Sequence, residues 1–197
     1  MFVTAEDFQT APYLLPNMDA DQNFADYIDQ EERERLKKLL GRTLFNSFMD
    51  GLYSDVVNLT ARDEQDIEQR WKDLRDGVSY TYGGYTYYWE GMEKLLRPYI
   101  YAMWIKHDSD KYNGSGGVNI PSSENASIVS PGGLIVRAFN EFSYLAGNEC
   151  RQEDTLYGYL FNSGDTFAGD IGEDFTSIQV YMSCRFQDPG RMNIFNI

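Results

Sequence analysis

Apolar side chains recur every three to four positions along most of the chain, the spacing of one face of an α-helix. This spacing predicts helices at about residues 20–41, 44–53, 60–77, 92–104, 131–147 and 155–161. A shorter helix is expected at about 5–9, because Thr4 and Asp7 have the spacing of a capping box. Gly41 is expected to stop or kink the first long helix, and Thr60 to cap the third. The pattern therefore predicts a mainly α protein.

Two segments depart from the helical period. Val78–Tyr82 and Tyr85–Trp89 flank Gly83 and Gly84, which supply the positive φ angles of a tight two-residue turn, so a small Tyr-rich β-hairpin is expected. Near the C-terminus, apolar and polar residues alternate from Phe175 to Phe186, a period of two that indicates a strand. A turn at 187–190 would lead into a second strand at 192–197. This C-terminal β-ribbon or arm, about 170–197, is expected to serve assembly more than the stability of its own domain.

Residues 109–133 are rich in Ser, Gly, Asn and Pro, which predicts a long loop. We expect it to project from a helical body at about 20–165 and to reach a neighbouring subunit. The whole chain, 1–197, is interpreted as one domain, a helical bundle with the hairpin and the C-terminal ribbon attached. Pro98 would mark a kink or the first turn of a new helix. The core is expected to centre on Leu39, Leu40, Phe48, Trp71, Leu96, Trp104 and Phe139.

Amino-acid composition and net charge narrow the classes of function that the chain could have. A hydrophobic share of 42% and an aromatic share of 15% suit a folded domain, while a net charge of -14 argues against tight nucleic-acid binding. No apolar run is long enough for a membrane span, and no signal peptide is evident, so synthesis in a host cytoplasm is expected. One cluster runs against the acidity. It is either a solvated helix face or an interface patch, and it consists of Arg33, Arg35, Lys37, Lys38 and Arg42.

Little in the sequence points to catalysis. The single histidine, His107, is expected at a helix end, where it would act as a cation rather than a base. Asp108 opens a stretch that lacks the register of a calcium loop. Cys150 and Cys184 do not form a zinc pattern. An enzyme working through Glu90, Glu93 and Asp108 is the remaining catalytic alternative. We expect no enzymatic activity, no cofactor and no metal.

The tyrosines of the hairpin are the strongest binding candidates. Tyrosine combines a large contact area with a low entropy cost, so Tyr82, Tyr85 and Tyr87 are predicted to form part of a protein interface. A carbohydrate-binding, adhesin-like platform is the alternative for the same residues. Half of the hairpin is also expected to face the core, because alternate residues of a strand point to opposite sides.

Several segments together resemble a phage protein family. They are Phe24-Ala25-Asp26-Tyr27-Ile28, Leu36 to Phe45, Trp71-Lys72-Asp73-Leu74 with Gly77 and Tyr80, Trp89-Glu90-Gly91-Met92, Glu124-Asn125-Ala126, Arg137-Ala138-Phe139-Asn140 and Thr155 to Leu160. In this order they are similar to the head-tail connector, or neck adaptor, family of tailed phages and prophages of Bacteroides-type hosts, including crAss-like phages.

The resemblance covers about residues 20–165 and implies a virion protein without catalytic residues. It implies a structural subunit that assembles with copies of itself, about 12 in a ring. That ring would lie below the portal protein, contact other neck or tail proteins and leave a channel for DNA. An acidic chain suits a channel through which DNA must slide without being held.

Overall fold

A computed structural model describes residues 2–15, 22–114, 132–147, 153–163 and 167. Helix takes up 66% of the described residues, and the strands among them form two small antiparallel hairpins. This confirms the mainly α prediction. The expected C-terminal strand at 175–186 and its partner at 192–197 lie outside the described residues, as do residues 115–131 of the expected loop.

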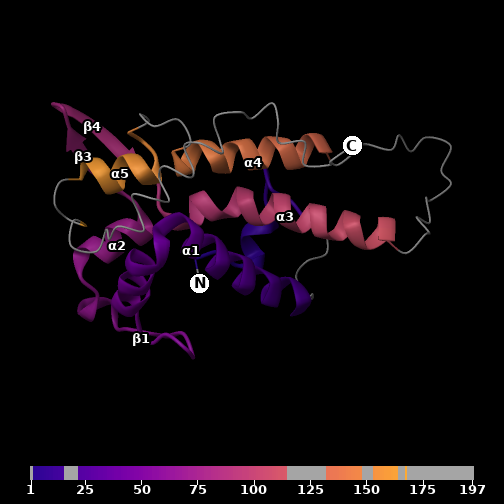
Figure 1. Cartoon of the computed structure of the whole chain (residues 1–197), viewed down its shortest axis with the longest axis horizontal. Coiled ribbons are helices and arrows are strands. Elements are labelled where there is room, and N and C mark those ends of the chain that lie inside the picture. The colour runs from indigo at the N-terminus through magenta and orange to yellow at the C-terminus, as the bar shows by residue number, and fades with distance from the viewer. Residues whose placement is uncertain (1, 16–21, 115–131, 148–152, 164–166, 168–197) are drawn as a thin grey trace.

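The elements follow one another along the chain in a simple order. The helices and 3-10 turns are η1 Ala5–Phe8, α1 Gln22–Leu52, η2 Glu64–Asp66, α2 Gln69–Asp76, α3 Met92–Gly114, α4 Gly132–Ala146 and α5 Leu156–Asn162. The strands are β1 Tyr53–Asp55, β2 Thr60–Ala61, β3 Val78–Tyr82 and β4 Tyr85–Trp89. Figure 1 shows α4 alongside α3, with α1 on the opposite side of α3 and both hairpins toward one end of the body.

Gly41 divides α1 into two helical halves, as the sequence predicted. Its φ of 72° and ψ of 168° lie outside the helical region, so the chain changes direction there. Glycine adopts this positive φ without the steric cost that a Cβ would bring. The bend lets residues on both sides of it, Leu40 and Leu44 among them, reach one core.

The helix expected from Thr60 begins only at Gln69, so the predicted start is wrong. Thr60 instead lies in β2, where it faces Asp55 of β1. The residue that follows β2 also bonds to the end of α1, because Arg62 N donates to Leu52 O at 2.9 Å. A hairpin between the end of α1 and η2 therefore uses residues whose capping pattern alone suggested a helix.

Helix α3 is longer than the sequence predicted. It continues through Pro98 and past Trp104 to Gly114, so residues 109–114, expected in the loop, are helical. Residues 132–133, at the other end of that expected loop, already belong to α4. His107 consequently lies inside the helix and not at its end. A proline removes one intrahelical hydrogen bond, and the burial of side chains on both sides of Pro98, Leu96 and Tyr99 among them, compensates for that loss.

The predicted core is confirmed for six of its seven residues. Leu39, Leu40, Phe48, Trp71, Leu96 and Trp104 are buried. Phe139 is the exception, since it is only partly buried at the edge of the core. Phe142, one turn later on α4, takes the fully buried position, and its ring centre lies 5.0 Å from that of Tyr99 on α3.

Candidate functional site

The hairpin β3–β4 is regular over its whole length. Its register pairs Val78 with Trp89 and Tyr82 with Tyr85, and the turn has positive φ angles of 58° at Gly83 and 85° at Gly84. Residues that face each other across an antiparallel pair lie on the same side of the sheet. One side, which we call the tyrosine face, therefore carries Val78, Tyr80, Tyr82, Tyr85, Tyr87 and Trp89.

The base of the tyrosine face is locked into the core. The Trp89 side chain is 1% exposed, and its indole Nε1 donates to the Leu74 carbonyl at 2.9 Å. Tyr80 packs edge-on against Tyr159 of α5, with ring centres 5.4 Å apart, and its hydroxyl donates to the Glu153 carbonyl. Burial raises the pKa of Tyr80 to about 12, so this hydroxyl stays protonated and remains a donor.

The far end of the same face is open to solvent. Tyr82 is 48% exposed and Tyr85 is 71% exposed, and we call these two residues the tyrosine tip. Tyr87 is half-buried, with its ring centre 5.9 Å from that of Tyr80. Tyr88, a hairpin tyrosine that was not among the predicted interface residues, is 51% exposed on the opposite side of the hairpin. A rigid base thus presents two exposed aromatic rings.

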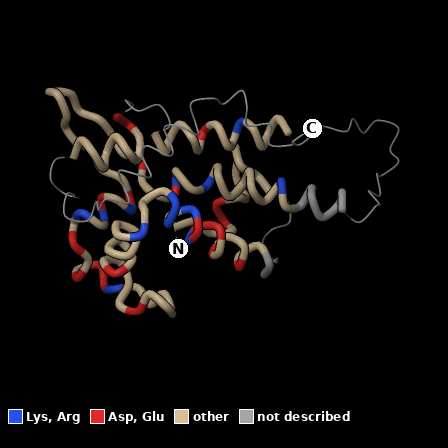
Figure 2. The backbone as a smooth tube through the Cα atoms, in the orientation of Figure 1, with Lys and Arg blue, Asp and Glu red and all other residues tan. Residues whose placement is uncertain are grey.

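The five basic residues of the predicted patch do not all point to solvent. Arg33 is half-buried, and its Nη2 donates to the Val56 carbonyl at 3.2 Å. The Arg35 guanidinium lies 4.0 Å from the ring centre of Tyr99, a cation–π arrangement within the fold. Figure 2 shows acidic and basic positions interspersed along α1.

The other three members of the run, Lys37, Lys38 and Arg42, are exposed. Lys38 Nζ lies 3.9 Å from Glu34, a surface ion pair of small energetic effect. An interface role stays a prediction for all five residues, and Arg33 and Arg35 in addition make contacts within their own chain.

A buried carboxylate within this charged stretch was not anticipated. Glu32 is 0% exposed, and its Oε1 accepts a hydrogen bond from Phe2 N at 2.7 Å. Its Oε2 is buried without a hydrogen-bond partner. Burial raises the pKa of Glu32 to about 7, although the bond from Phe2 N acts in the opposite direction. Glu32 therefore fastens the N-terminal segment to α1.

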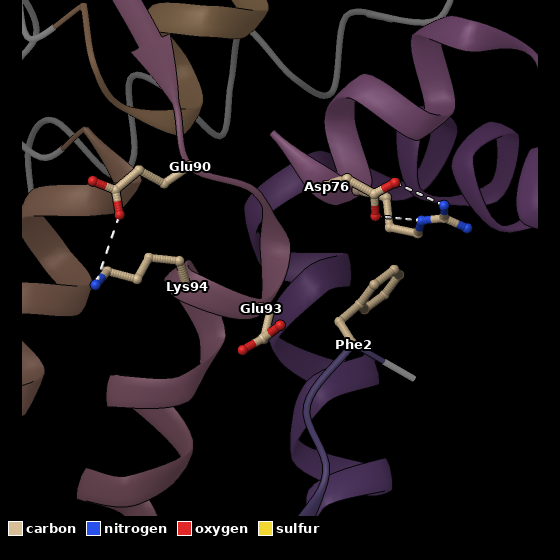
Figure 3. A pocket seen from close by; sticks show the side chains of 6 residues that line it. Phe2, Asp76, Glu90, Glu93 and Lys94 are labelled. Atoms are coloured by element: carbon tan, nitrogen blue, oxygen red, sulfur yellow. Dashed lines mark hydrogen bonds and ion pairs between the residues drawn. The ribbon is translucent and has the colours of Figure 1, made fainter. Parts of the chain in front are cut away.

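A polar pocket of about 570 Å³ holds two of the carboxylates considered for catalysis (Figure 3). Its lining residues are Phe2, Arg75, Asp76, Glu90, Glu93 and Lys94. Glu90 Oε2 lies 3.8 Å from Lys94 Nζ, an exposed pair of the kind found on helix surfaces. Arg75 is engaged by Asp76 at 2.6 Å and by Glu64 at 2.7 Å, and these two carboxylates raise its pKa. The arrangement is that of a surface ion-pair network.

His107 is part of an aromatic cluster. Its ring stacks on Tyr27 with centres 5.2 Å apart and lies 5.7 Å from the ring of Trp104. Within the described residues no group of three or more His, Cys, Asp or Glu side chains could hold a metal ion. None of the helices that the structure describes is long and apolar enough to cross a membrane.

Comparisons with protein-family models, with curated proteins and with solved structures found no match. The site is therefore defined by its own geometry, which is an aromatic tip on a hairpin whose base is buried.

Proposed function

We propose that this chain is a structural, non-enzymatic subunit of the head-to-tail connector of a tailed phage, and that it forms a ring below the portal protein. The observation that carries the proposal is the tyrosine tip, because Tyr82 and Tyr85 are exposed while the base of their hairpin is buried. Exposed aromatic residues on a rigid support are typical of the central contacts of protein interfaces. The segments that resemble connector proteins, at about 20–165, support the same assignment.

A ring subunit needs two different complementary surfaces, because side-to-side contacts in a ring are heterologous. The tyrosine tip and the exposed basic residues of α1 supply two candidate surfaces at different places on the body. The charge of the chain also agrees with this role, because a net charge of -14 disfavours tight binding of the DNA that passes through the channel.

The decisive experiment locates the chain in particles. Virions of the phage or prophage that encodes it should contain the chain at the neck, in a ring beneath the portal, when they are examined by cryo-electron microscopy. A chain absent from purified virions would overturn the proposal.

The contribution of the tyrosine tip can be tested separately. The double variant Tyr82→Ser, Tyr85→Ser should lose ring formation on the portal, because truncating central aromatic contacts weakens interfaces strongly. Tyr144→Ser is a matched control, since Tyr144 is 50% exposed on α4, far from the hairpin in the sequence. Rings that form equally well with the double variant would show that the tip is not an interface.

A carbohydrate-binding, adhesin-like virion module is the second candidate, and the same exposed rings favour it. Sugars stack on exposed tyrosine faces, and Tyr82 and Tyr85 stand side by side across a narrow Gly-Gly turn. Light scattering and titration calorimetry separate the two functions. A stable monomer that binds glycans, and loses them in the double variant, would support the module over the connector.

A further inference from the structure

The hairpin β3–β4 has two outer edges, and the alternation of its hydrogen bonds fixes which groups face outward. In a hairpin with a two-residue turn, the pair next to the turn exchanges backbone hydrogen bonds, and so does every second pair after it. Here these are Tyr82 with Tyr85, Tyr80 with Tyr87 and Val78 with Trp89. The intervening residues Ser79 and Thr81 therefore direct their backbone N–H and C=O groups away from β4.

The edge of β3 is open. Ser79 and Thr81 are exposed, and their backbone groups make no hydrogen bond within the described part of the chain. The edge of β4 is different, because Tyr88 N, which also points outward, donates to Asp154 Oδ1 at 2.9 Å. The segment that leads into α5 thus covers one edge of the hairpin and leaves the other for strand addition.

The residue pattern of β3 is similar to that of the segment 175–186. In β3 the aromatic and apolar residues alternate with Ser79 and Thr81, so one face is aromatic and the other is small and polar. In the segment 175–186 the residues Ile178, Val180 and Met182 alternate with polar ones in the same way. A strand of this kind placed on the edge would continue the tyrosine face with apolar side chains and the other face with polar ones.

Phe167, the last described residue before this segment, packs on the helix that supports β3. Its ring centre lies 5.7 Å from that of Tyr159, which in turn packs on Tyr80 of β3. The eight steps of backbone from Phe167 to Phe175 can span up to roughly 29 Å, so the segment is not restricted to its own chain. In the single chain Ser79 and Thr81 are exposed, so the edge is available to a second copy.

We propose that the outer edge of β3 accepts the C-terminal segment 175–186 of a second copy of this chain as an added strand. The proposal rests on the self-association that the connector function requires, and it names the contact through which two copies join. Strand exchange between neighbours would also give the C-terminal segment backbone partners that a two-stranded ribbon alone cannot supply.

Two proline variants of the full chain test the edge. Thr81→Pro removes an outward N–H and places a ring at the edge of β3, but it breaks no hydrogen bond between β3 and β4. Thr86→Pro is the matched control, because Thr86 faces Thr81 across the hairpin and is equally exposed, and its N–H points to the other edge. Self-association is measured by sedimentation equilibrium. Thr81→Pro should weaken it at least about tenfold, and Thr86→Pro should leave it within about twofold of the wild type.

Cysteine trapping identifies the partner strand. In a background with Cys150→Ser and Cys184→Ser, chains carrying Thr81→Cys are mixed with tagged chains carrying Gln179→Cys, Tyr181→Cys or Ser183→Cys. One of these mixtures should give a disulfide between a tagged and an untagged chain, because facing residues of neighbouring strands lie within bonding distance. Chains carrying Thr86→Cys in place of Thr81→Cys should give none.

Three results would overturn the proposal. The first is an equal effect of the two proline variants on self-association. The second comes from a chain that carries both cysteines, if its disulfide forms only within that chain. The third is a protein that stays monomeric and yields no disulfide between chains. Failure of the connector function looks different. Trapped pairs in a protein that is absent from virions would leave the strand contact standing, whereas portal-bound rings that Thr81→Pro leaves intact would remove only the strand contact.

Discussion

The hairpin β1–β2 is short and irregular, with a shift in register between Tyr53 and Asp55, whereas β3–β4 pairs regularly over five residues on each strand. The turn of the first hairpin is organised by polar groups. Asp55 Oδ1 accepts from Val57 N at 2.9 Å and from Asn58 N at 3.1 Å. The second hairpin has a turn of two glycines and an aromatic face that reaches into the core.

The helical body stabilises the two hairpins in different ways. A two-stranded ribbon is marginally stable in water and needs support from elsewhere. The first hairpin buries one aromatic ring, that of Tyr53, and gains further support from exposed hydrogen bonds and from Arg33, which donates to Val56 O. The second gains it by burying Trp89 and Tyr80, a larger effect, since buried aromatic rings dominate core energetics. The stronger support leaves the tip and edge of the second hairpin available for contacts.

The largest expected effect is at the base of the second hairpin. Trp89→Ala removes a buried ring and leaves the Leu74 carbonyl without its donor, so unfolding free energy should fall by about 3–5 kcal/mol. The counterpart at the first hairpin is Val57→Ala, at a side chain that is 86% exposed, and it should change stability by less than about 0.5 kcal/mol. Urea unfolding followed by circular dichroism measures both. Similar losses for the two variants would contradict the proposed difference in support.

A pair of glycine substitutions separates close packing from backbone strain. At Gly77, φ is 95° and an added Cβ would lie 2.5 Å from the Trp89 carbonyl oxygen, so Gly77→Ala should cost at least about 3 kcal/mol. At Gly84, φ is 85° but no atom lies within 4 Å of such a Cβ. Gly84→Ala should therefore cost only about 1–2 kcal/mol. Thermal melting of both variants ranks them, and a larger loss at Gly84 would refute the packing argument.

The buried carboxyl group of Glu32 should make the stability of the fold depend on pH. The folded-state pKa of Glu32, about 7, exceeds its ordinary value of 4.5. Its contribution to stability is therefore fully present below the ordinary pKa and is lost as pH rises through about 7.

The variant Glu32→Gln keeps an acceptor for Phe2 N and removes the titration. Between about pH 5 and pH 8 the wild type should lose about 2 kcal/mol of unfolding free energy relative to the variant. Denaturant unfolding at several pH values measures the difference. A constant difference across this range would mean that Glu32 does not titrate there.

The smallest effect is expected in the turn of the first hairpin. Hydrogen bonds from Asn58 lower the pKa of Asp55, so its contribution is present above the ordinary pKa and is lost as pH falls through the folded-state value. Asp55→Ala should speed amide exchange at Val57 and Asn58 and leave global unfolding nearly unchanged. Asp154→Ala is the parallel change at the second hairpin and should speed exchange at Tyr88 alone. Global unfolding of either variant would contradict this local role.

Much of the fold could be predicted from the sequence because it depends on neighbours along the chain. The period of 3.6 located the helices, and the Gly83-Gly84 turn between two aromatic runs located β3–β4, since turn geometry is set by a few adjacent residues. The change of direction at Gly41 follows from the same kind of local rule. These features needed no knowledge of what packs where.

The candidate site could be predicted only in part. The sequence predicts Tyr82, Tyr85 and Tyr87 as interface residues, but a Tyr-Thr-Tyr-Tyr run does not show which positions the body will cover. Tyr87 is half-buried, whereas Tyr88 is exposed. The hydrogen bond from Tyr88 N to Asp154, which covers the edge of β4, could not be predicted either, since it joins residues 66 positions apart. The open edge of β3 becomes visible only by contrast with that covered edge.

The order of the helices and the presence of one aromatic hairpin follow from the spacing of apolar residues along the chain. The environment of each polar residue depends instead on how the elements pack against one another. Glu32 and Arg35 belong to one charged run with Lys38, yet Glu32 is buried, Arg35 lies on the ring of Tyr99 and Lys38 is solvated. The reason is that burial depends on partners far away in the chain, such as Phe2 and Tyr99, whereas periodicity records only the residues on either side.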